Sequence, residues 1–255
     1  MSVIPPAPLQ RPLQQFFRSL PTPCPYLPGR TESKLFTRIT ERSGSEVNSI
    51  LSRAGFRRSH DVVYRPICGS CAACVPVRIP VAAFTPQRTQ RRIKRANEDL
   101  AINQTRAIAT AEQYRLFSRY QASRHGESDM ARMTSMDYGA MVEEGRADTC
   151  LIEARDGNGR LVAAMLTDRL DDGFSAVYSF FEPELERRSL GTFLILSLID
   201  RARAEGLPYV YLGYWISGSR KMAYKARFRP LEALGPHGWA PLADTGQGAS
   251  AQAAD

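Results

Sequence analysis

The alternation of apolar and polar residues marks out strands and helices along the chain. Residues 75–81 carry Val or Ile at every second position, and this two-residue period predicts a strand. Pro76 and Pro80 interrupt the segment, so we expect this strand at a sheet edge or at a bulge. Residues 43–54 instead repeat their apolar positions at helical spacing, which predicts a short helix that ends at Gly55.

From about residue 105 onward, the predicted elements follow one another closely. Thr110 and Thr134 each precede a helical pattern and are suited to cap it. Asp, Asn and Gly cluster between the apolar runs that follow, as in the turns of β-hairpins. The predicted strands of this part are 149–155, 161–170, 174–181 and 209–215, and its later helical segments are 189–205 and 218–228.

This order of elements predicts a mixed sheet with a crossover helix, which is the order found in the GNAT acyltransferase core. The fold class we expect is α+β, with a GNAT-like acyltransferase core and an N-terminal cysteine-containing α/β half. We place an N-terminal domain at residues 1–105 and the transferase domain at residues 106–242. Residues 243–255 are rich in Gly, Ala, Ser and Gln, which predicts a disordered tail.

Composition narrows the class of protein. The 255 residues are 43% hydrophobic and 24% charged, which is typical of a globular protein. Lys and Arg number 34 against 26 Asp and Glu, and the resulting charge of +8 favours an anionic partner such as nucleic acid. The longest apolar run, Leu190–Ile199, is shorter than the ~20 residues of a membrane span, and the N-terminus lacks the apolar core of a secretion signal. We therefore expect a cytoplasmic protein with no membrane partner.

Four of the five cysteines form a pattern typical of soft-metal sites. Cys68, Cys71 and Cys74 follow a C-x-x-C-x-x-C spacing, and Cys24 upstream can complete a set of four thiolates. The spacing predicts zinc or an iron–sulfur cluster and does not separate the two. The alternative is that these cysteines are small buried apolar residues, as we expect for Cys150 inside a predicted strand.

A basic segment predicts contacts with phosphate groups. Thr85-Pro86 opens a predicted helix that continues to about Leu100. Four cations share one face of this helix, and such a stripe neutralises the phosphates of a nucleic acid. The alternative is an ordinary solvated face. The four residues are Arg88, Arg91, Arg92 and Arg95.

The turn before the predicted helix 189–205 is a second candidate phosphate site. A helix N-terminus offers free N–H groups and the positive end of the helix dipole. Arg188 and Gly191 match the acetyltransferase pattern R/Q-x-x-G-x-G/A, but Phe193 replaces its last small residue, which disfavours coenzyme A as the acyl donor. We expect Ser189 and Gly191 to bind the donor; the alternative is a plain N-cap and a packing residue.

The chain also carries a series of short motifs in a fixed order. They are CPYLPGR at 24–30, GFRRSH at 55–60, YRP at 64–66, the cysteine run, PVRIP at 76–80, QRR at 90–92, SLG at 189–191, YVYLGYW at 209–215 and KMAYK at 221–225. In this order they resemble the aminoacyl-tRNA–protein transferase family, specifically its short bacterial branch, the aspartate/glutamate leucyltransferases. The resemblance covers nearly the whole chain.

The resemblance implies an enzyme that transfers leucine from leucyl-tRNA to the N-terminal Asp or Glu of acceptor proteins and so marks them for N-end-rule degradation. No ATP is needed, because the aminoacyl ester is already activated. The resemblance also implies an iron–sulfur cluster at the matching cysteines. Two alternatives stay open: arginyl-tRNA as the donor, and a non-catalytic metal-containing protein that binds tRNA or other RNA.

Family members carry an Asp before Pro in the strand ahead of the Ser-Leu-Gly motif, and Glu182 stands at that position here. The resemblance therefore makes Glu182 the candidate to orient or deprotonate the acceptor amine. The alternative is a surface carboxylate with no part in the reaction.

Recognition of an acidic N-terminal side chain requires a cation, preferably the two-pronged guanidinium of Arg. Arg78, Lys221 and Lys225 lie in matching motifs and are the candidates; each could equally be a phosphate contact or a scaffold ion pair. Tyr214 and Trp215 end a predicted strand and are candidates to line the leucyl pocket, with ordinary core as the alternative.

Overall fold

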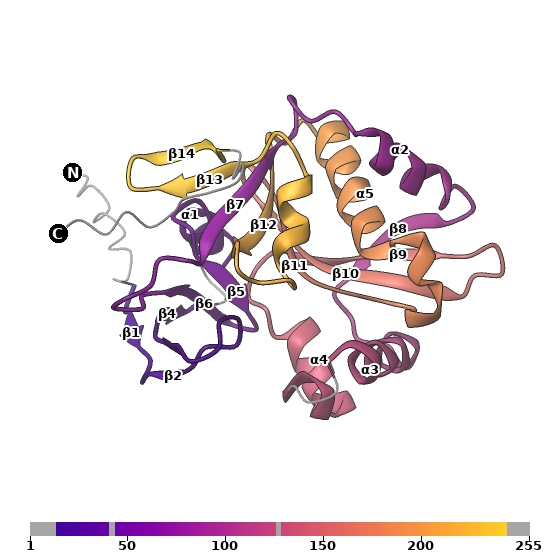
Figure 1. Ribbon diagram of the computed structural model, residues 1–255. Helices are drawn as coiled ribbons and strands as arrows, with labels where there is room; N and C mark the ends of the chain where they lie inside the picture. Colours follow the sequence, from indigo (N-terminus) through magenta and orange to yellow (C-terminus); the bar gives the residue numbers. More distant parts are fainter. Residues whose placement is uncertain (1–13, 41–43, 126–128, 244–255) are drawn as a thin grey trace, which may run out of the picture.

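The structure is a computed structural model that describes residues 14–40, 44–125 and 129–243. A large central sheet carries helices on both faces, and a small sheet stands at one end of it (Figure 1). No helix in this described part is long and apolar enough to cross a membrane. Apart from residue 243, the expected disordered tail lies outside the described residues.

Eight strands form the large sheet. They are β7 (Val75–Pro80), β8 (Ala101–Arg106), β9 (Thr149–Arg155), β10 (Leu161–Leu170), β11 (Gly173–Phe181), β12 (Tyr209–Trp215), β13 (Glu232–Gly235) and β14 (Gly238–Pro241). Their order is β14-β13-β7-β12-β11-β10-β9-β8. Neighbouring strands are antiparallel except β11 and β12, which are parallel. The predicted mixed sheet with a crossover helix is therefore confirmed.

Helices cover both faces of this sheet (Figure 1). They are α1 (Gly44–Arg53), α2 (Arg88–Arg95), α3 (Ala111–His125), α4 (Ser135–Glu143) and α5 (Leu190–Ala204), with short 3₁₀ helices η1 (Asp129–Arg132), η2 (Pro183–Arg188) and η3 (Ala223–Arg227). Side chains of β10 alternate between two cores: Ala163 and Met165 join the core of α5, while Ala164 and Leu166 join that of α3 and α4. Burial on both faces explains the long apolar run of this strand.

The parallel strands β11 and β12 pair over three positions only. Gly173–Ser175 lie opposite Tyr209–Tyr211, and beyond this stretch no further pairing joins the two described strands. β11 continues along β10, and β12 continues along β7. The sheet therefore opens between them, and backbone groups at the opening need other partners; the Val177 carbonyl accepts a hydrogen bond from Arg57.

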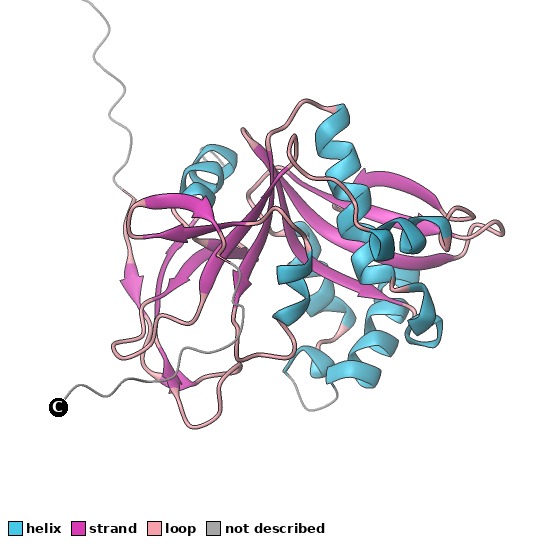
Figure 2. Cartoon of the chain, turned by 45° about the horizontal axis from the view of Figure 1, so that its top comes forward, coloured by secondary structure: helices cyan, strands magenta, loops and turns pink. Residues whose placement is uncertain are grey.

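The small sheet is built from the N-terminal residues. Its strands are β1 (Phe17–Arg18), β4 (Lys34–Arg38), β5 (Arg57–Ser59) and β6 (Val62–Pro66), in the order β1-β4-β6-β5, and β2 (Thr22–Pro23) pairs with β3 (Thr31–Glu32) in a separate ribbon. This sheet lies at the end of the molecule opposite α2 (Figure 1), and Figure 2 shows that strands predominate at that end.

A fully buried ion pair joins the small sheet to the large one. Arg58 on β5 donates from Nε and Nη2 to the two carboxylate oxygens of Asp168 on β10, at 2.6 Å each. The two side chains are 1% and 0% exposed. The amide of Asn48 and the hydroxyl of Thr149 donate to the same carboxylate. Because the charges are paired and hydrogen-bonded, the pair holds β5 in one position against β10.

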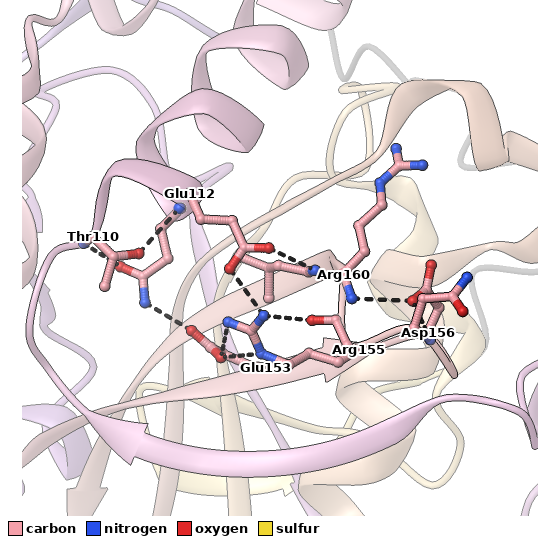
Figure 3. A network of polar contacts seen from close by, with 10 residues as sticks. Thr110, Glu112, Glu153, Arg155, Asp156 and Arg160 are labelled. Carbon is pink, nitrogen blue, oxygen red and sulfur yellow. Dashed lines mark hydrogen bonds and ion pairs between the residues drawn. The ribbon is translucent and has the colours of Figure 1, made fainter.

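Polar contacts also attach the start of α3 to the sheet (Figure 3). Thr110 and Gln113 cap the helix reciprocally: each backbone N–H donates to the other residue's side chain. Gln113 also donates to Glu153 on β9, and Arg155 pairs with both Glu153 and Glu112. The predicted cap after Thr110 is therefore confirmed, and it belongs to a network of ion pairs and hydrogen bonds that joins α3 to β9.

One strand differs from its expected position. We expected this strand at a sheet edge or at a bulge. β7 lies inside the sheet, between β13 and β12, so the edge position is wrong, but the pairing of β7 with β12 has the register shift of a bulge. Two features accommodate its prolines. β13 pairs with β7 only at Val77 and Arg78, so Pro76 and Pro80 need donate no hydrogen bond on that side, and β12 has a register shift between Tyr211 and Gly213.

Other differences concern boundaries. The expected division at residue 105 does not separate the sheets, because β7 and β8 from the N-terminal part are strands of the large sheet. The predicted helix 218–228 is reduced to turns and η3, and the predicted helix 85–100 to α2 with turns after it. The strands of the small sheet and the β13–β14 hairpin were not predicted, because they are short and lack a clear alternation.

Candidate functional site

Three adjoining pockets form one groove beside the opening between β11 and β12. We call them the strand pocket (≈ 330 Å³), the middle pocket (≈ 450 Å³) and the helix pocket (≈ 750 Å³). Ser179 and Lys221 line both the strand pocket and the middle pocket. Ser189 and Thr192 line both the middle pocket and the helix pocket, and Tyr224 lines all three.

The strand pocket lies where the two strands separate. Its apolar wall includes Met165 from β10, Ile195 from α5 and Leu212 from β12. Its charged lining residues are the cations Arg57, Lys221 and Lys225, and no Asp or Glu is among the described residues that line it. The strand pocket therefore suits a ligand with an aliphatic part and an anionic part.

The helix pocket lies at the N-terminus of α5. Ser189 precedes this helix with a left-handed backbone (φ 52°), and its carbonyl accepts the N–H groups of Thr192 and Phe193. The N–H groups of Leu190 and Gly191 belong to the first turn, where the helix itself offers no acceptor. Four arginines also line this pocket, so it combines helix-terminal N–H groups with positive charge. They are Arg92, Arg187, Arg227 and Arg229.

The predicted tRNA-binding residues are brought partly together by this arrangement. Ser189 lines the helix pocket and Gly191 lines the middle pocket, where a Cβ on Gly191 would come 3.0 Å from the Phe181 ring. The four arginines of α2 are exposed. A phosphate-binding face and an ordinary solvated face both predict this exposure. Of these four, Arg92 lines the described helix pocket and Arg91 bonds the carbonyl of Pro86 at 2.5 Å.

Of the three predicted cations of the acceptor site, the fold brings Lys221 and Lys225 to the strand pocket. Lys221 is exposed at the border of the strand and middle pockets. Lys225 is 2% exposed, lines the strand pocket and donates from Nζ to the Tyr214 carbonyl at 2.6 Å. Burial first, and the nearby charge of Arg57 second, hold the pKa of Lys225 well below its usual value.

Arg78 lies elsewhere. Its Nε is 2.7 Å from Glu232, its Nη1 donates to Tyr211, and its guanidinium stacks 3.5 Å above the centre of the Tyr209 ring. Burial alone would lower the pKa of Arg78, but Glu232 and Tyr211 raise it. A guanidinium that is already paired and stacked is not available to an acceptor, so the structure favours the scaffold ion pair.

Tyr214 and Trp215 belong to the interior rather than to the groove. Trp215 is 8% exposed and packs in the main core. The Tyr214 hydroxyl lies 3.0 Å from the carbonyls of both Gly55 and Tyr64, which ties β12 to the small sheet. Neither residue lines the three described pockets, so the structure favours the alternative of ordinary core for both.

Glu182 is a buried ion-pair carboxylate. It follows β11, is 2% exposed, and its Oε2 accepts hydrogen bonds from Arg119 at 2.9 Å and Arg160 at 2.6 Å. Burial alone would raise the pKa of Glu182, but the two guanidinium groups hold it below its usual value. Glu182 lines none of the three described pockets, so this geometry favours a structural role over that of a base.

The four predicted metal-ligating cysteines share another pocket of ≈ 580 Å³, lined by Cys24, Cys68, Cys71 and Cys74. Burial first, and then the other three thiols, raise the pKa of Cys74 to about 11. The pKa of Cys71 is lowered by the Ala73 backbone N–H and by Arg30. The donor chemistry fits a soft metal, but among the described residues no three such side chains stand in a metal-binding arrangement. Cys150 is buried core, as predicted.

Arg57 and Tyr224 are among the residues of the groove that were missed from the sequence. Arg57 stands in the GFRRSH motif and Tyr224 in the KMAYK motif, but neither is among the candidate site residues predicted from the sequence. The available signal was the Arg57-Arg58 pair: on a strand, neighbouring side chains point to opposite sides, so two adjacent arginines take different partners.

Comparison with known proteins gives matches over nearly the whole chain. The model for the N terminus of arginine-tRNA-protein transferases matches residues 22–92, and the model for their C terminus matches residues 112–235. The aspartate/glutamate leucyltransferase of Paramagnetospirillum magneticum is 54% identical over 91% of this chain and 95% of its own length. That of Parvibaculum lavamentivorans is 55% identical over 88% of this chain and 93% of its own.

A solved structure, L-PGS from Bacillus licheniformis, aligns with a TM-score of 0.46 at 12% identity, covering 56% of this chain and 47% of that one. At this level the likeness supports no argument, and the assignment rests on the sequence matches. They define the class of protein, an aminoacyltransferase. The chain belongs to the arginine-tRNA-protein transferase family, and its relatives there are aspartate/glutamate leucyltransferases. The resemblance of the motifs is thereby confirmed.

Glu182→Gln tests whether Glu182 is an ion-pair partner or a base. We expect the free energy of unfolding to fall by about 1–3 kcal/mol near neutral pH, because two guanidinium groups lose their anionic partner. The folded pKa of Glu182 lies below its unfolded value of about 4.3, so its stabilising contribution is present above that pH and is lost as the pH falls through the folded pKa.

Urea unfolding of wild type and variant across pH, together with the transfer rate of the folded variant, measures both properties. The stability difference should be constant above about pH 5 and shrink below about pH 4. Exposed Glu184→Gln is the matched control and should change neither property. Loss of turnover at unchanged stability would instead identify Glu182 as the base.

Proposed function

We propose that this protein transfers leucine from leucyl-tRNA to the N-terminal Asp or Glu of acceptor proteins, which marks them for N-end-rule degradation. The observation that carries the proposal is the match of about nine tenths of the chain to aspartate/glutamate leucyltransferases at 54% identity. The groove adds a physical basis, because it combines a basic end with a pocket that is both apolar and cationic.

The reaction is the aminolysis of an ester. The acceptor α-amine attacks the carbonyl carbon of the leucyl ester, a C–N bond forms, the C–O bond to the terminal ribose breaks, and the proton lost by the amine goes to the departing ribose oxygen. An unperturbed α-amino group has a pKa of about 7.7–8.0, so a fraction is already neutral near pH 7. No ATP enters, because the ester supplies the activation.

We assign the helix pocket to the 3′ end of the tRNA. Its arginines and the first-turn N–H groups of α5 suit phosphate oxygens. Arg92 joins this pocket to the exposed arginines of α2, which extend the positive surface along the helix. The terminal leucyl group would then reach the strand pocket through the middle pocket, past Tyr224.

We also propose that Cys24, Cys68, Cys71 and Cys74 hold an iron–sulfur cluster or zinc. The support is that four soft donors from two distant segments share one pocket. Such a group would tie the β2–β3 region to the residues that lead into β7. Because its substrate is charged tRNA, we place the enzyme in the cytoplasm.

The donor assay tests the function directly. Purified protein should transfer radiolabelled leucine from leucyl-tRNA to peptides that begin with Asp or Glu, and should leave peptides that begin with Ala unlabelled. Arginyl-tRNA offered at the same concentration is the matched donor control. Transfer of arginine alone would retain the family and reject leucine; tight tRNA binding without any transfer would favour a non-catalytic RNA-binding protein.

Arg92→Gln tests the assignment of the helix pocket. The Michaelis constant for leucyl-tRNA should rise, and the slope of its logarithm against the logarithm of salt concentration should fall by about 0.7–0.9, the value for one lost phosphate contact. Arg38→Gln, which removes an exposed arginine paired with Asp61 on the small sheet, should change neither quantity. An unchanged salt slope in Arg92→Gln would remove Arg92 from the tRNA interface.

Metal analysis tests the cysteine proposal. Protein purified without oxygen should contain iron with sulfide, or zinc, and Cys71→Ser should lower that content while Cys150→Ala, in the core, should not. Visible absorption distinguishes the cluster from zinc. Wild-type protein free of both metals would contradict the proposal.

A further inference from the structure

We propose that the Arg57 guanidinium in the strand pocket binds the side-chain carboxylate of the acceptor's N-terminal Asp or Glu. The inference rests on the proposed function and goes beyond it by naming the residue that selects the acceptor. None of the cations predicted from the sequence is this residue.

The charge balance of the strand pocket is the first argument. Arg57, Lys221 and Lys225 line it, and the described lining contains no Asp or Glu. Elsewhere in the described chain, buried arginines have carboxylate partners: Arg58 pairs with Asp168, and Arg78 pairs with Glu232. Burying part of a guanidinium without such a partner costs folding free energy, and an anionic ligand that pairs with it offsets this cost.

The hydrogen bonds of Arg57 are the second argument. A guanidinium has five N–H donors, and within the described residues Arg57 donates to the carbonyl of Val177. Burial alone would lower the pKa of Arg57, but four neighbouring tyrosines raise it; they are Tyr64, Tyr26, Tyr224 and Tyr214. Donors therefore remain for a carboxylate, which a guanidinium can hold by two parallel hydrogen bonds.

The backbone around Arg57 is arranged to admit its side chain. On β5, Arg58 points to Asp168, so Arg57 points to the opposite side, toward the opening of the large sheet. There it crosses Gly213 of β12, where a Cβ would come 2.6 Å from Arg57 Nη1. Gly213 has a φ of +70° next to the register shift of β12, so both its space and its backbone favour glycine.

Neither lysine of the pocket is as well suited. Lys225 is 2% exposed and donates to the Tyr214 carbonyl, and its lowered pKa disfavours its charge. Lys221 is exposed at the border, where solvent screens it. Arg57 remains charged at every relevant pH and lies in the same pocket as the apolar wall of Met165, Ile195 and Leu212. A carboxylate on Arg57 and an aliphatic leucyl side chain can therefore occupy one pocket.

The test compares peptides that differ only in Glu or Gln at the first position, because Gln keeps the shape and removes the charge. In Arg57→Met, kcat/KM for the Glu peptide should fall roughly 100-fold, mainly through the Michaelis constant, while that for the Gln peptide should hardly change. The ratio between the peptides should therefore approach one. Arg57→Lys keeps the charge but loses the two-pronged geometry, so it should give an intermediate ratio. Arg38→Met is the matched control and should keep the wild-type ratio.

Two results would overturn the inference. One is a ratio of kcat/KM for the Glu peptide to kcat/KM for the Gln peptide that stays at the wild-type value in Arg57→Met. If that variant does not fold, the same result in Arg57→Lys overturns the inference. The other is an increase in the Michaelis constant for leucyl-tRNA with the peptide ratio intact, which would make Arg57 a phosphate contact. Peptide binding by fluorescence anisotropy needs no transfer, so the preference for Glu over Gln is measured even if the proposed reaction fails.

Discussion

The bidentate pair of Arg58 and Asp168 is the contact on which the rest of the site depends. It is buried, it joins the small sheet to β10 of the large one, and its carboxylate receives further hydrogen bonds from Asn48 and Thr149. Removing one partner from such a pair leaves an unpaired buried charge, at a cost of about 3–5 kcal/mol. The two sheets therefore hold one relative position, and the residue beside Arg58 is fixed with it.

That neighbour is Arg57, and because neighbouring side chains on a strand point to opposite faces, its side chain points away from Asp168. The opening of the large sheet exists because β11 and β12 pair at only three positions and then follow different neighbours. Arg57 enters this opening from the small sheet, across Gly213, and bonds the free carbonyl of Val177. The opening of the large sheet and an arginine of the N-terminal region thus make one pocket.

The cations of this basic chain differ in whether a carboxylate of the protein is paired with them. Some are paired within the protein, as Arg78 is with Glu232 and as the exposed Arg119 and Arg160 are with the one buried carboxylate of Glu182. Others line the strand pocket, where no Asp or Glu is among the described lining residues. A third set is exposed to solvent on α2. Net charge alone does not separate these groups, because it counts a paired arginine and an available one equally.

The sequence by itself determined the strands β9 to β12, the crossover helix, the caps at Thr110 and Thr134, the burial of Cys150 and the family. These depend on local periodicity, local turn chemistry or the order of motifs, all of which are written in neighbouring residues. Only the tertiary structure decided that β7 is an interior strand, that Tyr214 and Trp215 are core, and that Arg57 lies in the groove while Arg78 does not. Those outcomes depend on partners more than a hundred residues away, such as Glu232 for Arg78 and Val177 for Arg57, and no local pattern specifies which distant group will neutralise a charge.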